Sequence, residues 1–528
     1  MIWKVRVTEM SYIDKIFPNI PPREEVVARY PARKLPDGAR VTRFAPSPTG
    51  FVHIGNMMGA LTDERIAHLS GGIFMLRIED TDAKREVAGA DRLVIDTLLE
   101  YGIKFDEGPG IGGAYGPYYQ SERRELYHAF AKWGLENGAA YACFMSGADL
   151  EKLRAEQESL GLRTGVYGKW ARDRDLPPEE VERRIDAGEP YVIRFKSGGN
   201  PDNKCVVQDM IHGKIAMPEN DYDEVILKGD GLPSYHFAHV VDDTLMGTTL
   251  VIRGDEWLPS APKHIQMFKA FGLKVPKYAH HGLLQKTDGG LRRKLSKRKD
   301  PEALMPWYDQ EGYPKTAVAE YLMNLLNSGF EDWRRNNPDK NYREYPLALA
   351  KMSASSALFD IVKLSSVSKG VIARMSSAEF YDATLAWAKR YSPKLTKILQ
   401  SHADKARAAF AIERDGTDRP RKDISKWSEV EGEFEYMWRA PPRPSDIPPA
   451  EADVIADFLA TYDANDDKDA WFRKISDISA RHFPNENATR AMQILRRLIT
   501  GRDKSPDLWA IMRALGRNET LARLGPGK

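Results

Sequence analysis

The chain has 528 residues, of which 78 are lysine or arginine and 76 are aspartate or glutamate, so its formal net charge is +2 at pH 7. Hydrophobic residues make up 42% and charged residues 29%, which is typical of a globular protein of roughly two to four domains. A membrane-spanning protein is excluded because no apolar run is long enough to cross a bilayer, and so is a strongly basic protein that coats nucleic acid, although a local basic face is enough for a nucleic-acid partner.

The N-terminus and the cysteines indicate the compartment. The first residues mix charged and apolar side chains and lack the apolar core of a secretory signal. Cys143 and Cys205 are the only cysteines and lie far apart in the chain. They are too few for a disulfide framework or for a thiolate zinc site, which needs about four ligands. We therefore expect a cytoplasmic protein without zinc.

The first part of the chain predicts one strand–helix–strand unit of a parallel sheet. Residues 1–39 are rich in proline and alternating charges and are expected to form a surface extension. Residues 41–45 are β-prone, and a proline-rich turn separates them from a helical pattern that starts at Ile54 and stops at two glycines. Residues 73–78 form the next short apolar run. Ligands of such a sheet bind at the carboxyl ends of its strands.

The middle of the chain predicts an inserted module. Residues 120–200 alternate helical and turn patterns, and residues 125–144 predict an amphipathic helix that ends near a glycine. Strand-like runs follow at 191–196, 223–243 and 248–257, and we expect them to rejoin the first sheet. A nucleotide-binding domain with an insertion is the resulting prediction.

The last third of the chain is helical in period. Beyond about residue 315 strand patterns almost vanish, and polar linkers separate the helical segments. The predicted fold class is therefore α/β: a Rossmann-like parallel-sheet domain with an inserted module, followed by an all-α C-terminal domain.

The sequence PSPTGFVHIGN, which ends at Asn56, has the properties of a nucleotide-phosphate site. The prolines stiffen the turn, and Gly50 permits backbone conformations that other residues resist. His53 would stand at a helix N-terminus, where unpaired N–H groups attract anions, and could donate a hydrogen bond to phosphate. Gly55 would let a flat base approach the backbone. Taken alone, a proline-rich surface loop with a histidine explains the motif about equally well.

A second candidate is the basic sequence RRKLSKRKD at residues 292–300. Its lysines could neutralise charge that develops on a triphosphate, and Ser296 could donate a hydrogen bond to it. A solvated basic loop explains such a sequence more often when it stands alone, and the same residues could bind a nucleic-acid backbone. The combination with the upstream phosphate motif and a parallel-sheet pattern favours the nucleotide site.

These motifs carry a resemblance to a known family. HIGN looks like the first signature of class I aminoacyl-tRNA synthetases, and KLSKR looks like the second. RFAPSPTGFVHIGN, LRIEDTDAKR, GPYYQSERRELY, LPSYHFAHVVDDTLMGTTLVIRGDEWLPSAPKH and KLSKRKD together resemble glutamyl-tRNA synthetases of the bacterial type. The match runs in order through roughly residues 40–330 and continues weakly into residues 356–364.

The resemblance implies a reaction and its partners. Glutamate attacks the α-phosphate of ATP to give glutamyl-adenylate and pyrophosphate, and the terminal ribose of tRNA(Glu) then takes the glutamyl group. Mg²⁺ would accompany ATP through phosphate oxygens rather than through a protein cage. Catalysis would consist of positioning and charge stabilisation. A monomer is expected, and charging of tRNA(Gln) as well stays open.

The resemblance also implies site residues. Glutamate carries two carboxylates and one ammonium, so Arg43 and Arg253 would hold the carboxylates and Glu79 the ammonium. The other residues implied at glutamate are Ala45, Ser47, Tyr235 and His239. Those implied at ATP are His53, Gly55, Glu256 and Lys297, with Trp257 beside them. The catalytic set of the two signatures is His53, Asn56, Lys294, Ser296 and Lys297.

Four positions depart from the family pattern. Asn56 replaces a histidine, which removes one imidazole donor, and Leu295 replaces a methionine of similar volume. His239 stands where many relatives have asparagine, and Thr244 where histidine is common. His239 therefore leaves the shape of the amino-acid pocket open.

The family implies a division of the chain. We expect an extension at residues 1–39, a catalytic domain at 40–120 and 200–285, and an inserted acceptor-stem-binding module at 121–199. The KLSKR loop with a stem-contacting helical region is expected at 286–335, and a helical anticodon-binding domain at 336–528. An arginine after the stretch FDIVKL helps the family to distinguish glutamate from glutamine anticodons; here the position is Ala373 or its neighbour Arg374.

Four alternatives are weighed against this prediction, and the first, a short tRNA-modifying relative without an anticodon domain, is disfavoured by the length of the chain. Glutaminyl-tRNA synthetases share the signatures, but their anticodon-binding part is usually a β-barrel, whereas this chain ends in a helical pattern. A catalytically inactive tRNA-binding paralogue would be expected to lose His53 or Lys297, and both are present. A nucleotidyltransferase acting on small molecules would not need the helical third.

Overall fold

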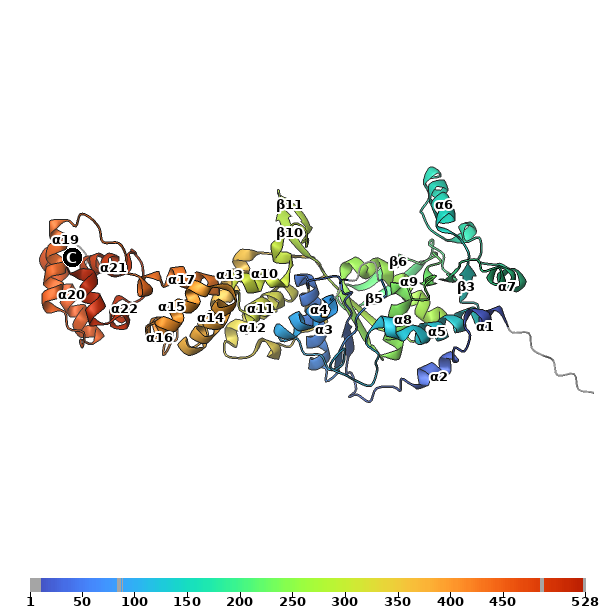
Figure 1. The fold of residues 1–528 in the computed structure, drawn as a ribbon, viewed down its shortest axis with the longest axis horizontal. Coiled ribbons are helices and arrows are strands. Elements are labelled where there is room, and N and C mark those ends of the chain that lie inside the picture. The colour runs from blue at the N-terminus through green and yellow to red at the C-terminus, as the bar shows by residue number, and fades with distance from the viewer. Residues whose placement is uncertain (1–10, 83–86, 88, 485–488, 526–528) are drawn as a thin grey trace, which may run out of the picture. The chain divides into compact units, whose positions relative to one another are not determined.

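The computed structural model describes residues 11–82, 87, 89–484 and 489–525 (Figure 1). They form two compact units. Unit 1 contains the described residues up to Met305, Met323–Arg334 and Asn341–Phe359, and unit 2 contains Pro306–Leu322, Arg335–Lys340 and the described residues from Asp360 onward. Unit 1 combines helices with parallel strands, and unit 2 is helical, which confirms the predicted fold class.

Unit 1 contains both strands and helices. Its strands are β1 (Val41–Phe44), β2 (Ile73–Leu76), β3 (Ala140–Cys143), β4 (Val192–Phe195), β5 (Lys204–Asp209), β6 (Gly213–Pro218), β7 (Val225–Leu227), β8 (Leu250–Gly254), β9 (Lys277–His281), β10 (Leu284–Asp288), β11 (Leu291–Lys294) and β12 (Ala357–Leu358). Its helices are α1 (Tyr12–Ile16), α2 (Arg23–Ala28), α3 (Ile54–Leu69), α4 (Ala90–Glu100), α5 (Arg124–Glu136), α6 (Gly147–Ser159), α7 (Pro178–Asp186), α8 (Tyr235–Leu245) and α9 (Ala261–Ala270).

The predicted strand–helix–strand unit is confirmed. β1 pairs with β2 in parallel, from Val41 opposite Ile73 to Phe44 opposite Leu76, and α3 connects them. The helix ends just before Gly71, whose φ of 68° is the left-handed conformation that glycine adopts readily after a helix. The glycines that follow α3 in the sequence therefore determine where the helix that connects β1 to β2 ends.

A four-stranded sheet continues the architecture in the order β6-β5-β9-β8. β8 and β9 are parallel, and the Thr249 N–H donates to the Val41 carbonyl (3.0 Å), so β8 begins beside β1. The strand predicted within residues 248–257 is thus confirmed next to the first sheet. The carboxyl ends of β1, β2, β8 and β9 meet at one edge, where parallel sheets bind ligands.

One strand-like run contains a helix in its second half. Residues 223–243 contain the short strand β7, but α8 begins at Tyr235 and buries Phe237, Val240, Val241 and Leu245. These side chains recur every three or four residues, which is the period of a helix. Their β-branched and aromatic composition hid that period from the sequence analysis.

The prediction that residues 191–196 rejoin the first sheet is wrong. β4 pairs with β3 on one side and β7 on the other, in a separate antiparallel sheet of three strands. The helix predicted over residues 125–144 is shorter than expected: α5 ends before Gly138, whose φ is 69°, and β3 covers residues 140–143. Short-range patterns do not state which sheet a strand joins.

Residues 11–39 pack on unit 1 as a strap rather than forming a free extension. Phe17 and Val26 are buried in the same core as α5 and α8. The Arg33 Nη1 and Nη2 donate to the two carboxylate oxygens of Glu107 (2.7 and 2.8 Å), and its Nε donates to the Met246 carbonyl (2.9 Å). The Arg23 guanidinium lies 3.8 Å from the Trp133 ring centre and donates to the carbonyl of Phe271. The strap therefore belongs to the folded catalytic unit.

Val26→Ala tests this packing. The side chain is fully buried, so losing two methyl groups is expected to lower the free energy of unfolding of unit 1 by about 2 kcal/mol. Val27→Ala is the matched control, because Val27 is exposed on the same helix and its truncation should change stability by less than about 0.5 kcal/mol. Urea denaturation of both variants gives the comparison; equal values would show that the strap does not pack as described.

Unit 2 is built from helices. Three helices lie where the two units alternate along the chain: α10 (Met305–Glu311), α11 (Lys315–Leu326) and α12 (Gly329–Asn336). The others are α13 (Ile361–Ala373), α14 (Ser377–Tyr391), α15 (Pro393–Ser401), α16 (Ala403–Ala411), α17 (Val430–Glu433), α18 (Glu435–Trp438), α19 (Pro449–Thr461), α20 (Lys468–His482), α21 (Thr489–Thr500), α22 (Leu508–Leu515) and α23 (Arg517–Leu524). The helices from α13 to α23 share one hydrophobic core, which includes Phe380, Phe410, Trp471 and Ile499.

In the part of the chain that the structure describes, no helix is both long and apolar enough to cross a bilayer.

Candidate active site

A cavity of about 1280 Å³ opens at the carboxyl ends of the parallel strands of unit 1. Its walls come from the turn after β1, the start of α3, the segment after β2, the end of β8 and the loop after β11. Parallel strands bring these distant segments to one edge of the sheet. The predicted site residues that line it are Arg43, Ala45, Ser47, His53, Gly55, Asn56, Glu79, Tyr235, Arg253, Glu256, Trp257, Lys294, Ser296 and Lys297.

His53 is held in one protonation state by the start of α3. It is the N-cap residue, and its Nδ1 accepts the Gly55 N–H (2.9 Å). The proton of the neutral ring is therefore on Nε2, which lies 3.3 Å from the Leu295 carbonyl oxygen. A Cβ on Gly55 would stand 3.1 Å from the His53 ring, so a larger residue would crowd this contact. The arrangement presents an N–H donor where the sequence predicts phosphate.

Burial lowers the pKa of His53 to about 4, and the nearby Lys297 and Lys294 charges act in the same direction. The ring is therefore neutral at physiological pH. Because this pKa is below the unfolded value of about 6.5, protonation opposes folding. The contribution of His53 to stability is present above pH 6.5 and is lost as the pH falls towards 4.

His53→Asn keeps an acceptor for the Gly55 N–H but removes the Nε2–H donor. We expect aminoacylation to slow about 10- to 100-fold, the worth of one hydrogen bond to a charged group. The ratio of the wild-type rate to the variant rate should stay constant between pH 5.5 and 8, since His53 does not titrate there. A ratio that changes about ten-fold around pH 6.5 would contradict the assignment of a neutral ring.

The loop after β11 closes against the turn that precedes α3. The Lys297 Nζ donates to the Phe51 carbonyl (2.8 Å), and the Lys294 Nζ lies 3.2 Å from Glu256 Oε1. Asp300 accepts the Ser296 N–H (2.9 Å) and pairs with Arg293, which holds the pKa of its carboxyl group well below the usual range. The two signature sequences thus lie face to face, with their lysines and His53 directed into one space.

Arg43 and Glu79 also line the cavity. The Arg43 Nε is held by Asp243 (3.1 Å), and Arg77 bridges Asp243 (2.7 Å) and Glu79 (3.2 Å). Burial raises the pKa of Glu79, while the Arg77 and Arg43 charges oppose the rise. A bound ammonium group would favour the ionised carboxylate. The site therefore offers a cation and an anion to one small zwitterion.

Arg253 supplies the second cation. Its Nε donates to His280 Nε2 (2.9 Å), and its Nη1 lies 3.4 Å from the Tyr235 hydroxyl. Its Nη2 is buried and has no hydrogen-bond partner among the described residues. The Tyr235 ring packs against Trp257, with ring centres 4.6 Å apart. An unpaired guanidinium N–H is costly to bury, so this end of the cavity is suited to a carboxylate.

His239 is not among the residues that line the cavity. Its fully buried ring lies beneath the wall, where Nδ1 is 2.8 Å from Asp243 Oδ2 and Nε2 is 3.2 Å from the Tyr278 hydroxyl. Burial lowers its pKa to about 4. Thr244 also lies away from the cavity and bonds to the Val240 carbonyl (2.8 Å). Neither departure from the family pattern changes the lining of the cavity.

Several polar residues at the site were missed by the sequence analysis. Asp242 and Asp243 pair with Arg123, Arg77 and Arg43 beneath the cavity wall, and Asp63 lines the cavity with its carboxyl pKa raised by burial. Consecutive aspartates on the apolar helix VVDD are a signal that could have found the first two, because buried carboxylates are normally paired.

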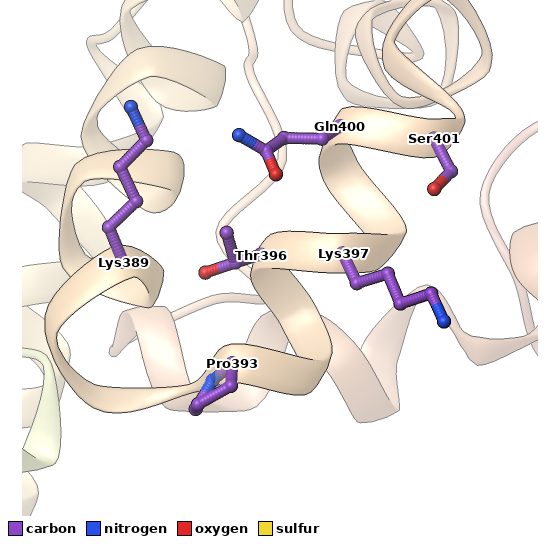
Figure 2. A pocket seen from close by; sticks show the side chains of 6 residues that line it. All are labelled: Lys389, Pro393, Thr396, Lys397, Gln400 and Ser401. Atoms are coloured by element: carbon purple, nitrogen blue, oxygen red, sulfur yellow. The ribbon is translucent and has the colours of Figure 1, made fainter.

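Arg374 lies in unit 2, directly after α13. Its side chain is partly exposed and bonds to Glu320 Oε1 (2.7 Å), whereas Ala373 is buried. A small polar hollow of about 430 Å³ lies elsewhere in unit 2, between α14 and α15. Figure 2 shows Thr396 and Gln400 facing the helix that carries Lys389, while Lys397 points away from it. No predicted site residue lines this hollow.

Within the described residues, no group of three or more His, Cys, Asp or Glu side chains is arranged to hold a metal ion. Cys143 and Cys205 are both free thiols.

Comparisons with known proteins agree with this geometry. The family described as "tRNA synthetases class I (E and Q), catalytic domain" matches residues 40–334, and an "Anticodon binding domain" matches residues 444–527. The chain is 45% identical over 548 aligned positions to a glutamate–tRNA ligase of Clostridium perfringens, covering 98% of this chain and all of the relative. It is 44% identical to that of Acetivibrio thermocellus, covering 97% of this chain and 98% of the relative.

Solved structures give the same result. A glutamate tRNA ligase from Elizabethkingia meningosepticum, in complex with its amino acid, superposes with a TM-score of 0.77 at 29% identity, covering 92% of this chain and 98% of that one. The glutamate-tRNA synthetase of Elizabethkingia anophelis gives 0.74 at 28% identity, with 92% and 99% covered. The chain therefore belongs to the glutamate–tRNA ligase family of class I aminoacyl-tRNA synthetases.

Proposed function

We propose that this chain attaches glutamate to the 3′ end of tRNA(Glu) for translation, with ATP as the second substrate, and that both chemical steps occur in the cavity of unit 1. The observation that carries the proposal is the division of the cavity lining into two sets. Arg43, Arg253 and Glu79 match the charges of glutamate, and His53 and Lys297 supply donors for phosphate. Relatives named glutamate–tRNA ligase over nearly the full length support the same function.

The first step is formation of the adenylate. A carboxylate oxygen of glutamate forms a bond to the α-phosphorus of ATP, and the bond from that phosphorus to the bridging oxygen breaks, which releases pyrophosphate. No covalent bond to the protein is required. Arg43, Glu79 and Arg253 orient the amino acid, which converts the encounter into a reaction between fixed partners. Lys297, Lys294 and the neutral His53 ring stabilise the charge that develops on the phosphates.

In the second step, a hydroxyl oxygen of the terminal ribose attacks the carbonyl carbon of the adenylate. The ester bond forms, the bond to AMP breaks, and the hydroxyl proton leaves to a phosphate oxygen or to water. Mg²⁺ fits this site as a companion of ATP, since it keeps water and phosphate oxygens as ligands and needs few protein groups. Its chemistry is to neutralise phosphate charge, and the lysines of the loop after β11 act on the same charge.

The remaining assignments follow from the same proposal. Residues 121–199 would contact the acceptor stem, residues 286–335 the adjoining stem, and residues 336–528 the anticodon arm; the match of residues 444–527 to an anticodon binding domain supports the last. Arg374 would contact the anticodon. The protein would act as a monomer in the cytoplasm, where its tRNA is.

Aminoacylation of separate transcripts tests the function. Purified protein, ATP, Mg²⁺ and labelled glutamate are expected to charge tRNA(Glu). Charging of tRNA(Gln) in addition would make it a non-discriminating enzyme, and Arg374→Ala would then identify the anticodon contact through a change in the ratio of the two rates. Transfer of glutamine, or of no amino acid, would overturn the proposal in favour of a glutaminyl enzyme or an inactive tRNA-binding relative.

A further inference from the structure

Two buried side chains behind the cavity wall connect Arg253 to the end of β5. In the parallel pair of β8 and β9, Arg253 lies directly opposite His280, and Asp209 at the end of β5 lies opposite Tyr278. His280 Nε2 is 2.9 Å from Arg253 Nε, and His280 Nδ1 is 2.7 Å from Asp209 Oδ2. His280 is fully buried and Asp209 is 5% exposed. Neither lines the cavity.

The protonation of this chain of groups is determined by Arg253. A guanidinium group can only donate, so His280 Nε2 must accept from it. The ring proton then lies on Nδ1 and is donated to Asp209. Burial lowers the pKa of His280, in keeping with a neutral ring. Although burial acts to raise the pKa of Asp209, the hydrogen bonds from His280, His212 and Ile211 keep it below the usual value.

The consequence is a guanidinium group that is fixed at its Nε. With that atom held, Nη1 lies between the Tyr235 hydroxyl (3.4 Å) and His264 Nδ1 (3.3 Å). Nη2 is left buried and without a partner among the described residues, while Arg253 lines the cavity. The Arg253 side chain is only 8% exposed. Because buried polar groups are normally paired, the contacts at Nε and Nη1 hold the side chain while its Nη2 is left for a ligand in the cavity.

We propose that Asp209 and His280 are positioning residues for amino-acid recognition. The Asp209 carboxylate selects the tautomer of His280, and the ring then holds Arg253 so that Nη2 meets a carboxylate of glutamate. The two residues act through Arg253 and do not touch the substrate. The inference rests on the proposed placement of that carboxylate at Arg253, and it adds a specificity-determining layer to the site.

Asp209→Asn tests the inference. Asp209 Oδ1 also accepts the Ile211 and His212 N–H groups (both 2.9 Å). In either orientation of the new amide, its NH₂ group therefore faces another N–H donor, either these backbone groups or His280 Nδ1–H. If the amide N–H faces His280, the ring proton moves to Nε2 and meets Arg253 Nε. We expect the KM for glutamate to rise about ten-fold or more, as when a wrong tautomer or a lost outer hydrogen bond displaces a ligand group. The KM values for ATP and tRNA should stay within about two-fold.

Matched variants separate positioning from a general loss of structure. Asp223→Asn is the control, because Asp223 is also a buried carboxylate with backbone and arginine partners but lies outside the cavity; it should leave the KM for glutamate unchanged. His280→Gln retains an acceptor within reach of Arg253 Nε and should recover much of the affinity lost in His280→Phe. This pair also serves if Asp209→Asn fails to fold.

The outcomes are distinct. An unchanged KM for glutamate in Asp209→Asn, or equal losses in His280→Gln and His280→Phe, overturns the positioning role. An equal rise in all three KM values, as from general distortion, overturns it as well. If Arg253→Ala itself leaves the KM for glutamate unchanged, it is the proposed placement of the carboxylate at Arg253 that fails.

Discussion

Lys297→Ala is expected to lower the kcat of aminoacylation by about 10²- to 10³-fold, which is the effect of removing one preorganised group that stabilises charge in the transition state. The Lys297 Nζ lies beside the turn that carries His53 and donates to the Phe51 carbonyl. Desolvation lowers the pKa of Lys297, and among the residues that the structure describes no carboxylate pairs with its ammonium group. The charge is therefore available to the phosphates. Steady-state charging of tRNA(Glu) gives kcat, and the KM for glutamate should change little.

Lys299→Ala is the control for this variant. Lys299 is exposed in the same loop but does not line the cavity, so its removal should leave kcat within about two-fold. A comparable loss in both variants would mean that the loop acts through its overall charge. A Lys297→Ala enzyme with the kcat of the wild type would remove this lysine from the mechanism.

Arg253→Ala is expected to reduce kcat/KM for glutamate by about two to three orders of magnitude, since truncating one partner of a buried charge pair costs 2–5 kcal/mol. The loss should appear mainly in the KM for glutamate, because Arg253 no longer holds one of the two carboxylates of this substrate. Steady-state charging assays with varied glutamate concentration measure the change.

Arg194→Ala is the control for Arg253→Ala, because the two arginine side chains are buried to a similar extent. Arg194 is 7% exposed, donates to the Asp223 carbonyl (2.8 Å) and lies on β4, away from the cavity. Its removal should lower stability and leave the KM for glutamate unchanged. If Arg253→Ala resembled this control in all respects, Arg253 would be a structural residue and the cation for the second carboxylate would have to be sought elsewhere.

The strand–helix–strand unit was predictable because the residues that end its strand and its helix are close to them in the sequence. Two prolines and Gly50 mark the turn, and Gly71 marks the end of α3; the φ values of the glycines, 109° and 68°, are those that glycine adopts most readily. The family motifs then assign residues from segments far apart in the chain. The cavity brings fourteen of the fifteen residues predicted in this unit, Trp257 included, to one surface.

The misassigned elements share a physical cause, which is tertiary context. α8 has the composition of a strand, and only its burial pattern reveals a helix. β3, β4 and β7 have ordinary strand patterns, but the choice of sheet depends on pairing across long sequence distances. His239 has the sequence position of a substrate contact, yet Asp243 and Tyr278 hold its ring beneath the wall.

The contacts of the strap and of the buried residues Asp209, His280 and Arg253 could not be predicted from local sequence patterns for a different reason. Arg33 and Glu107 are separated by 74 positions in the chain, and Asp209, Arg253 and His280 come from three strands. Single residues of common types carry no signal of such partners. Only the register of β8 against β9 places Arg253 opposite His280 and makes the contact visible.

A crystal structure of this protein with glutamate and a non-hydrolysable ATP analogue would test the central claim most directly. The account predicts the glutamate ammonium within hydrogen-bond distance of Glu79, its two carboxylates at Arg43 and Arg253, and the phosphates between His53 and Lys297. Glutamate bound away from both arginines, or phosphates that do not approach His53 and Lys297, would contradict it.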